Sequence, residues 1–403
     1  MREYPRNLWV LAIGMMINVT GTSFLWPLNT IYISEVLGHT LRDAGFVLLL
    51  NSGANLLGNL LGGALYDRIG GKKTIFIGVI LSCLAVIALA YNREWYFYIS
   101  MMILLGFSGG LVFPAIYAMA NGVWPEGGRK AFNVIYVSQN VGVAIGSALG
   151  GIVSMFSFTY VFLANALTYF IFLLIIWLGL DNKLATQPRD FVDRGEQKQA
   201  KDQVEIRAHR LELYALSLLS YGFMAVWLGY VQLQTTVSVY MESMGITRAH
   251  YSSLWAINGA LILLLQPFLS RLVNRYMSSI TAQLLVGGSL FTVSILYFSQ
   301  QTTYLGFVAG MVVITIGEML VWPAIPTAVA YLSPPGKSGL YQGIASGAAT
   351  IGKMIGPYLG GILYDSYNYT FMMLVMVVIV ATSLFSFFFY SQVGRRREKE
   401  LQF

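Results

Sequence analysis

The chain has 403 residues, of which 56% are hydrophobic and 11% are charged. An ordinary soluble domain carries roughly 25% charged residues, so this composition excludes a soluble globular protein. The formal charge of +7 does not require a nucleic-acid partner, because the cations lie in short turns between apolar segments and form no basic face. The composition therefore indicates a chain whose main solvent is the lipid bilayer.

Apolar stretches recur along the whole chain, each long enough to cross a hydrocarbon layer roughly 30 Å thick. The first stretch follows Arg2 and Arg6, but it is too long for a signal peptide and no small-residue cleavage site follows it. We expect an all-α membrane protein with twelve transmembrane helices. The expected spans are 8–33, 44–65, 74–91, 96–121, 131–154, 160–180, 212–240, 251–271, 279–298, 304–332, 339–363 and 370–390.

The distribution of positive charge predicts the topology, because cytoplasmic loops carry an excess of Lys and Arg. If the N-terminus is cytoplasmic, 21 of the 25 Lys and Arg residues fall on the cytoplasmic side. The outer loops hold Arg42, Arg93 and Arg248, and Lys353 falls inside a span. We therefore expect both termini to be cytoplasmic in a multi-pass protein of a bacterial plasma membrane.

The turn after the second span reads GALYDRIGGKK from Gly63 to Lys73. It resembles the cytoplasmic signature of the major facilitator superfamily, in which Gly71 either adds a residue to the pattern or replaces the basic residue that usually follows the second glycine. The resemblance implies that Asp67 binds the eleventh helix and closes the inner gate, whereas the alternative is a basic turn that only sets topology. The residues expected in this gating motif are Gly63, Asp67, Arg68, Gly70, Lys72, Lys73 and Arg129.

One long polar segment, residues 181–210, divides the chain into two sets of six spans. It mixes both signs of charge and has almost no aromatic residues, as a solvated linker does. We expect a six-helix bundle at 1–180, a cytoplasmic linker at 181–210, and a second six-helix bundle with a short cytoplasmic tail at 211–403. Two bundles related by a pseudo-two-fold axis would form the major facilitator fold.

The two halves repeat each other in sequence. Residues 140–153 and 350–363 match at seven of fourteen positions with an offset of 210. Phe113-Pro114-Ala115-Ile116 matches Trp322-Pro323-Ala324-Ile325 at an offset of 209, and Glu35, Gly38 and Asn51 match Glu242, Gly245 and Asn258 at 207. Repeats of this kind are typical of transporters whose substrate binds near the bilayer midplane.

Glycines recur at four-residue spacing in the fifth and eleventh spans. The pattern in the fifth span is similar to the motif of proton-driven antiporters in this superfamily, although Ser147 replaces the usual proline. Small residues allow close helix contact, and a proline loosens the helix so that it can bend during gating. Ordinary small-residue packing is the alternative. The expected helix-bending residues are Gly142, Gly146, Gly150, Gly151, Gly352, Gly356, Pro357, Gly360 and Gly361.

Glu318 and Lys353 are the two charged residues expected at mid-depth in the membrane. Each costs about 2.5 to 3.5 kcal/mol to insert, so each needs a partner or a role. In one interpretation they form a buried ion pair that fixes the packing of the second half. In the other, Glu318 is the proton-coupling carboxylate, its proton affinity depends on Lys353, and proton binding competes with substrate.

Other kinds of site lack support in the sequence. Cys83 is the one cysteine, and His39, His209 and His250 are scattered, so we expect no metal site, no catalytic residue and no cofactor. Gly336-Lys337-Ser338 has Tyr331 where a phosphate-binding loop needs glycine. By resemblance, spans 1, 4, 7 and 10 border the substrate pathway. The pathway residues expected from polarity and aromatic character are Trp26, Asn29, Asn51, Tyr117, Tyr230, Gln234, Asn258 and Trp322.

Several functions fit these features. The first is a proton-coupled antiporter that exports amphipathic, drug-like compounds, resembling the twelve-helix drug:proton antiporter group. The others are a lipid or glycolipid exporter or flippase, a proton-coupled nutrient symporter in which Lys353 binds an anion, and a membrane sensor without transport. We expect a small-molecule substrate, protons and the lipid bilayer as partners, and a monomer that is not an enzyme.

Overall fold

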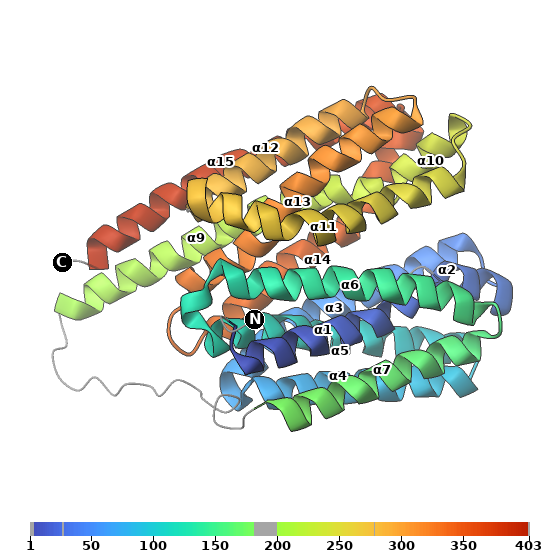
Figure 1. Ribbon diagram of the computed structural model, residues 1–403, viewed down its shortest axis with the longest axis horizontal. Coiled ribbons are helices and arrows are strands. Elements are labelled where there is room, and N and C mark those ends of the chain that lie inside the picture. The colour runs from blue at the N-terminus through green and yellow to red at the C-terminus, as the bar shows by residue number, and fades with distance from the viewer. Residues whose placement is uncertain (1–3, 26–27, 181–199, 278, 402–403) are drawn as a thin grey trace. The chain divides into compact units, whose positions relative to one another are not determined.

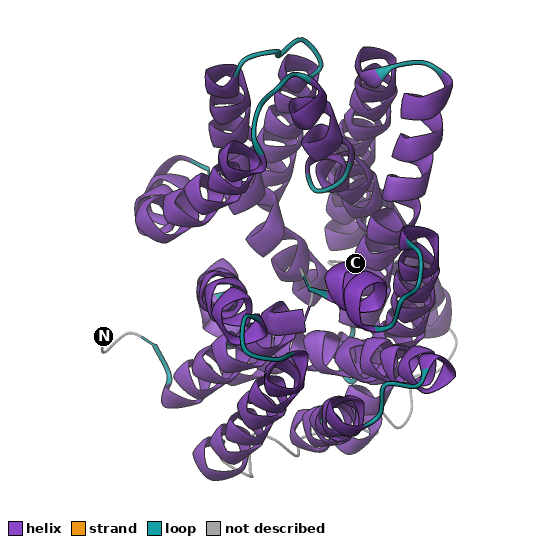
Figure 2. Ribbon diagram, turned by 90° about the vertical axis from the view of Figure 1, so that its right-hand side faces the viewer, coloured by secondary structure: helices purple, strands orange, loops and turns teal. Residues whose placement is uncertain are grey.

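The computed structural model describes residues 4–25, 28–180, 200–277 and 279–401. Within these ranges the secondary structure is helical and contains no strand (Figure 2). Trp26 and the first nineteen residues of the expected linker, 181–199, lie outside the described residues. The remainder of that segment belongs to a helix that begins at Ala200.

The chain divides into two compact units, and the first comprises residues 1–189 together with 336–347. Its long helices are joined by short turns, and a single π-helical turn and a 3₁₀ turn interrupt the series (Figure 1). Its elements are α1 (Arg6–Leu25), α2 (Asn29–Ile31), the π-turn η1 (Tyr32–Val36), α3 (Leu41–Ile69), α4 (Gly71–Tyr91), α5 (Trp95–Val123), the 3₁₀ turn η2 (Pro125–Gly127), α6 (Arg129–Ser154) and α7 (Phe158–Gly179).

The second unit comprises residues 190–335 and 348–403, so the first turns of α14 group with the first unit. Its elements are α9 (Ala200–Tyr230), the 3₁₀ turn η3 (Val231–Leu233), α10 (Thr236–Ser243), α11 (Arg248–Tyr276), α12 (Ile280–Phe298), α13 (Tyr304–Leu332), α14 (Ser338–Ser366) and α15 (Tyr369–Leu401).

The twelve expected spans correspond to twelve long helices in the described parts of the chain. Eleven of the helical stretches in the described residues are long and apolar enough to cross a membrane, with α9, η3 and α10 counted as one. The twelfth helix, α14, is 29 residues long, but its many glycine and polar residues lower its mean hydropathy. The expected twelve-helix fold is thus confirmed, and α14 is the least lipid-like of its helices.

One span that the sequence predicts as continuous is interrupted. The span predicted at 212–240 breaks at the 3₁₀ turn Val231–Leu233. The Gln232 side chain binds the backbone of another helix, which fixes the irregular turn in place. The span predicted at 8–33 contains α1, which ends at Leu25, and the short α2, which begins at Asn29, while residues 26–27 lie outside the described residues.

Helix packing follows the same order in both units. In the first unit α1 packs on α7, α3 on α5, and α4 on both α5 and α7. In the second unit the equivalent helices α9 and α15, α11 and α13, and α12 with α13 and α15 form the same pairs. Both units therefore share the helix arrangement that the sequence repeat predicts.

The turns between helices follow local sequence rules. Thr40 caps α3, because its hydroxyl accepts from Asp43 N while the Asp43 carboxylate accepts from Thr40 N. Gly38 and Gly245, which match in the repeat, have positive φ angles of 71° and 76°. Only glycine adopts this conformation without strain. The matched glycines therefore form equivalent turns before α3 and α11.

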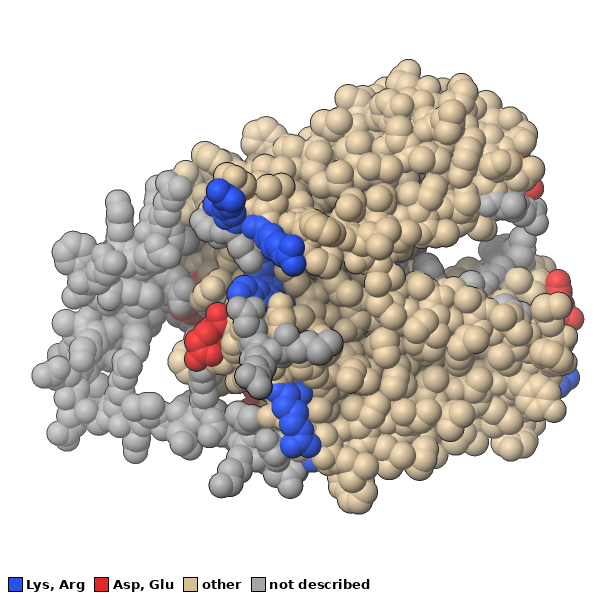
Figure 3. All heavy atoms as spheres, viewed as in Figure 1, with Lys and Arg blue, Asp and Glu red and all other residues tan. Residues whose placement is uncertain are grey.

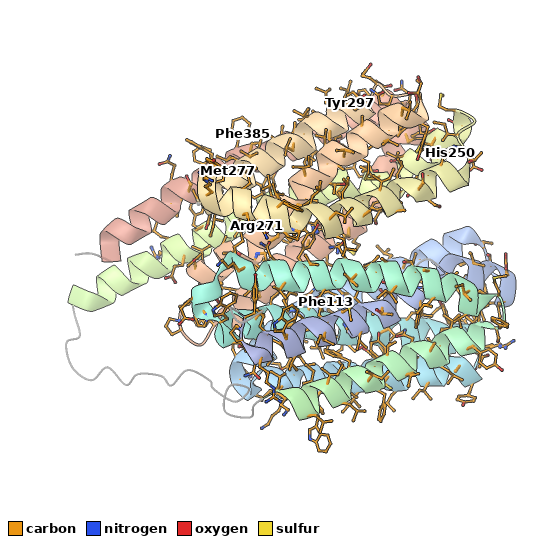
Figure 4. The ribbon with its side chains drawn as sticks, in the orientation of Figure 1. Phe113, His250, Arg271, Met277, Tyr297 and Phe385 are labelled. Carbon is orange, nitrogen blue, oxygen red and sulfur yellow. The ribbon has the colours of Figure 1, made fainter. Side chains whose placement is uncertain are left out.

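The charged side chains visible on one face of the molecule lie toward the helix ends (Figure 3). On the face drawn in Figure 3, Lys and Arg gather near one end of the helices, and uncharged residues cover the surface along their length. Along α11, His250 lies in the first turn and Arg271 near the other end (Figure 4). This pattern is that of helices whose middle sections contact lipid or other helices.

Candidate ion-coupling and substrate site

Glu318 lies near the middle of α13 and is 4% exposed. Two donors from other helices of the second unit meet its Oε2 atom. Tyr230 Oη on α9 donates at 2.9 Å, and Asn258 Nδ2 on α11 also donates at 2.9 Å. Such donors stabilise an ionised carboxylate, whereas burial opposes ionisation. The strength of these two hydrogen bonds therefore depends on whether the carboxyl group is ionised.

Asn258 connects this carboxyl group to the backbone of α13. Its Nδ2 atom also donates to Thr315 Oγ1 at 2.9 Å, and Thr315 Oγ1 donates in turn to the Met311 carbonyl at 2.7 Å. Thr315 and Glu318 are three residues apart and share one helix face. The sequence predicts Asn258 and Tyr230 as pathway residues, and the structure places both in direct contact with Glu318.

Lys353 lies near the middle of α14 and is exposed rather than packed in the interior of the unit. Its Nζ atom lies 3.9 Å from the centroid of the Trp227 ring on α9. No ion pair involving Lys353 occurs among the residues that the structure describes. The structure therefore does not show the ion pair that one interpretation of the sequence predicts between Glu318 and Lys353. Instead, Tyr230 and Asn258 bind Glu318, and Trp227 contacts Lys353.

The contact with Trp227 offsets only part of the free-energy cost of placing the Lys353 charge at mid-depth in the membrane. A cation over an aromatic ring gains about 0.5 to 1 kcal/mol at an exposed site and about 2 kcal/mol when desolvated. Placing a lysine at the centre of a membrane helix costs about 2.5 to 3.5 kcal/mol. An ammonium group in this position retains a net attraction for an anion.

Three aromatic rings from two other helices, α9 and α12, surround Trp322. Its ring centroid lies 4.9 Å from that of Trp227, 5.3 Å from that of Tyr230 and 5.3 Å from that of Phe291. The rings of Trp322 and Phe291 are stacked, with an interplanar angle of 12°. The Lys353 ammonium and the Glu318 carboxyl group thus border one aromatic cluster, defined here as Trp227, Tyr230, Phe291 and Trp322.

Asp67 lies near the end of α3 and binds the first turn of α14. Its Oδ1 and Oδ2 atoms accept hydrogen bonds from the backbone N–H groups of Gly339 and Leu340, each at 2.8 Å. These N–H groups have no acceptor within their own helix, and a helix N-terminus attracts negative charge. A Cβ atom at Gly63 would collide with the Gly339 carbonyl, so glycine at position 63 permits this contact.

The cations of the predicted gating motif have different surroundings. Lys72 Nζ donates to the carbonyl groups of Trp177 at 3.1 Å and Leu180 at 3.2 Å, at the C-terminal end of α7. Arg68 and Lys73 are exposed, whereas Arg129 at the start of α6 is buried. Lys72 therefore binds a helix C-terminus, where a cation is favourable.

The glycines of the predicted helix-bending motif lie where helices touch. Added Cβ atoms at Gly142 and Gly150 would lie 2.5 Å from the Met16 carbonyl oxygen and 3.0 Å from Phe24 Cα, both on α1, and one at Gly146 would collide with the Thr20 carbonyl. Each glycine thus permits α6 to approach α1. Gly151 lies within α6.

The equivalent glycines of α14 face α9 and η3. A Cβ atom at Gly352 would lie 2.7 Å from the Met224 carbonyl oxygen, and those at Gly356 and Gly360 would collide with the side chains of Val231 and Gln232. A Cβ atom at Gly361 would meet nothing within 4 Å. Pro357 lies inside α14, which continues through it as one helix.

Gln232 is a polar anchor of this contact that sequence reasoning missed. Its Nε2 atom donates to the carbonyl groups of Gly356 at 2.7 Å and Leu228 at 3.0 Å, and its Oε1 atom accepts from Thr236 Oγ1 at 3.1 Å. The residue is fully buried. The sequence signal that could have identified it is a glutamine within an apolar span.

The predicted pathway residues of the first unit bridge helices. Asn51 Nδ2 on α3 donates to the Met102 carbonyl on α5 at 2.7 Å. Asn29 Oδ1 accepts from Tyr98 Oη at 3.0 Å. Both asparagines therefore form hydrogen bonds that connect neighbouring helices.

Tyr117 and Gln234 are the remaining pathway residues in the described part of the chain. Tyr117 Oη on α5 accepts from Gln139 Nε2 on α6 at 3.0 Å. Gln234 follows the 3₁₀ turn that ends at Leu233. The structure therefore brings Tyr230, Asn258 and Trp322 together around Glu318, and it distributes the other predicted residues elsewhere.

Trp227 and Phe291 are site residues that the sequence did not reveal. Trp227 precedes Tyr230 by three residues, so helical spacing could have placed it on the same face of α9. Phe291 comes from α12, a helix that sequence reasoning assigned no role. Its stacking on Trp322 depends on the packing of α12 against α13.

Two units, each with six long helices among the described residues, and a buried carboxyl group on one helix that accepts hydrogen bonds from two others define a multi-pass membrane transporter. The chain belongs to the Major Facilitator Superfamily, whose family model matches residues 11–345 and 282–402. Members of this family are transporters, not enzymes.

Individual proteins agree with this assignment. The chain is 49% identical to an uncharacterized MFS-type transporter, YttB, of Bacillus subtilis (strain 168), over 92% of this chain and 91% of the relative. It is 24% identical to a Na(+), Li(+), K(+)/H(+) antiporter of Planococcus maritimus, over 93% of both chains. It is also 24% identical to the multidrug resistance protein MdtH of Aeromonas hydrophila subsp. hydrophila, over 91% of this chain and 90% of the relative.

The fold also matches solved structures of transporters. A POT family transporter crystallised in complex with 5-aminolevulinic acid superposes with a TM-score of 0.73 at 16% identity, over 97% of both chains. At this identity the likeness concerns the fold alone.

Proposed function

We propose that this transporter is a proton-coupled antiporter that exports amphipathic, drug-like compounds by alternating access. The observation that carries the proposal is the Glu318 carboxyl group, buried at the middle of α13 and bound by Tyr230 and Asn258. A transporter that exchanges a proton for substrate needs a group that can bind a proton within the membrane. Among the described residues of the second unit, Glu318 is the carboxyl group at mid-depth.

The polar contacts of Glu318 suggest how proton binding is coupled to substrate. When Glu318 is ionised, Tyr230 and Asn258 donate to it. When it takes up a proton, its demand for these donors falls, and the Tyr230 ring is free to shift within the aromatic cluster. Because Tyr230 lies 5.3 Å from Trp322, ring centroid to ring centroid, protonation of Glu318 changes the surface that a substrate contacts.

The aromatic cluster supports an amphipathic substrate. Flat aromatic rings bind apolar ligands through large contact areas and favour cations or ring stacking at their faces. The name of the relative from Aeromonas hydrophila, a multidrug resistance protein, agrees with this substrate class, and the name of the relative from Planococcus maritimus agrees with proton antiport. The glycine motif from Gly142 to Gly151, which is similar to that of proton-driven antiporters, supports antiport.

Gating is proposed for the contact between Asp67 and α14. The two hydrogen bonds to Gly339 N and Leu340 N hold the first turn of α14, and alternating access would break and reform them. We further propose a location in the bacterial cell membrane with both termini cytoplasmic, on the distribution of Lys and Arg, and a monomeric unit of transport.

Proton release from everted membrane vesicles tests the coupling role. Respiration acidifies the vesicle interior, and an exported compound added outside should then raise the internal pH as protons leave in exchange. We expect Glu318→Gln to reduce this substrate-induced pH change at least tenfold. Glu35→Gln, at an exposed position in the π-turn, should retain the wild-type response.

Two results would contradict the proposal. An undiminished pH change in Glu318→Gln vesicles would remove Glu318 from proton coupling. A substrate-induced fall in internal pH would indicate symport, in which proton and substrate move in the same direction.

A further inference from the structure

Among the described residues, the Lys353 ammonium group contacts an aromatic ring rather than an anionic acceptor. Its Nζ atom lies over the Trp227 ring, 3.9 Å from the ring centroid. It forms no ion pair with any residue that the structure describes. Lys353 is nevertheless exposed near the middle of α14, and a charge at this depth is placed toward protein or water rather than lipid. The group is therefore accessible to a ligand.

Trp227 adds a second donor beside Lys353. Its side chain is 9% exposed, and its indole Nε1 atom is buried with no hydrogen-bond partner. A buried N–H group without an acceptor is costly, and such groups are rare in native structures, so this N–H calls for a partner that the described residues do not supply. The same ring thus carries a cation over its face and an unsatisfied N–H at its edge. Both features favour an acceptor with negative charge.

The surroundings add an apolar surface, and among the described residues no carboxylate lies within ion-pair distance of Lys353. Trp322 lies 4.9 Å from Trp227, ring centroid to ring centroid, and continues the aromatic surface. Glu318 Oε2 accepts from Tyr230 and Asn258. A ligand with a flat apolar body and one anionic group would stack on the aromatic cluster and place its anion at Lys353.

We propose that Lys353 and Trp227 bind the anionic group of the transported compound, so that the substrates are amphipathic organic anions such as aromatic carboxylates or sulfonates. This inference rests on the proposed function, because it names the class of compound that the same site exports. Lys353 supplies the charge and selects anions over neutral and cationic compounds. Trp227 supplies the stacking surface and one N–H donor.

Binding of three matched probes to the purified full-length protein in detergent tests this inference. The probes are 2-naphthoate, the neutral 2-naphthamide and the cationic 2-naphthylmethylamine, which share one aromatic body. We expect isothermal titration calorimetry to show at least tenfold tighter binding of 2-naphthoate than of the other two. Lys353→Gln should abolish this preference, and Lys353→Arg should retain it because the charge remains.

Two further variants separate the site from general effects. Trp227→Phe keeps a ring but removes the N–H donor, so it should weaken 2-naphthoate binding several-fold and leave 2-naphthamide binding nearly unchanged. Lys130→Gln removes one exposed positive charge at the start of α6 and should not alter the preference. Elution of each variant as a single species from size-exclusion chromatography checks that it is folded.

The inference is overturned if the wild-type protein binds the three probes equally or not at all. It is also overturned if folded Lys353→Gln still prefers 2-naphthoate. Neither result bears on Glu318, because the vesicle assay detects proton exchange with a neutral or cationic compound equally well. Conversely, loss of Glu318 coupling would leave the binding preference at Lys353 unchanged.

Discussion

Tyr230 Oη donates a hydrogen bond to Glu318 Oε2 at 2.9 Å, and this contact joins α9 to α13 across the aromatic cluster. Hydrogen bonds to charged groups are worth more than neutral ones. The contact therefore couples the position of an aromatic side chain to the charge of the one acidic side chain at mid-depth in the described part of the second unit.

The change Tyr230→Phe tests the strength of this contact. We expect it to lower the free energy of unfolding by about 1 to 2 kcal/mol, because a buried carboxylate loses one of its donors. Tyr251→Phe is the matched control, since Tyr251 Oη donates at 3.0 Å to the neutral Leu233 carbonyl. Denaturant unfolding in detergent should show the larger loss for Tyr230→Phe. Equal losses would mean that Glu318 is not ionised in this state.

The contact of Asp67 with α14 predicts a graded series. Asp67→Asn keeps one acceptor oxygen, and Asp67→Ala keeps none. We expect transport to fall in both, further in Asp67→Ala, with a loss of about 1 kcal/mol in stability as for other helix caps. Asp43→Asn, which alters the cap of α3, should reduce stability without a comparable loss of transport. Wild-type transport rates in Asp67→Ala would exclude a gating role for this carboxylate.

Two glycines of the repeated motif differ in the space available for an added Cβ atom. A Cβ atom at Gly146 would collide with the Thr20 carbonyl, whereas one at Gly361 would meet nothing within 4 Å. We expect Gly146→Ala to lower the thermal unfolding midpoint, because α1 and α6 must separate. Gly361→Ala should leave it unchanged or raise it, since alanine favours a helix over glycine by about 1 kcal/mol. The opposite order would show that these glycines do not set the helix contact.

Adjacent lysines of the gating motif predict different effects. Lys72 donates to the Trp177 and Leu180 carbonyl groups at the end of α7, whereas Lys73 is exposed. We expect Lys72→Met to cost about 0.5 to 1 kcal/mol in unfolding free energy and Lys73→Met to cost close to nothing. Thermal unfolding of the two variants checks this difference. Equal stability would indicate that Lys72 does not stabilise α7.

The positions of the helices could be predicted from the sequence because the bilayer imposes a simple rule. A segment in hydrocarbon must satisfy its own backbone hydrogen bonds, so long apolar stretches become helices. The span expected at 304–332 coincides with α13, and the span at 339–363 lies within α14. The interruption of the span expected at 212–240 could not be foreseen, because the turn at Val231–Leu233 depends on a contact between Gln232 and another helix.

The identities of the embedded charges were also evident from the sequence, since Glu318 and Lys353 stand alone among apolar residues. Their partners were not. Sequence proximity of two helices favoured an ion pair, but helix rotation turned Glu318 toward Tyr230 and Asn258 and Lys353 toward Trp227. The sequence alone determined the class of protein, its helices and its embedded charges, because these follow from local composition. Only the tertiary structure decided which side chains meet, because contacts between helices depend on how each helix is rotated about its own axis.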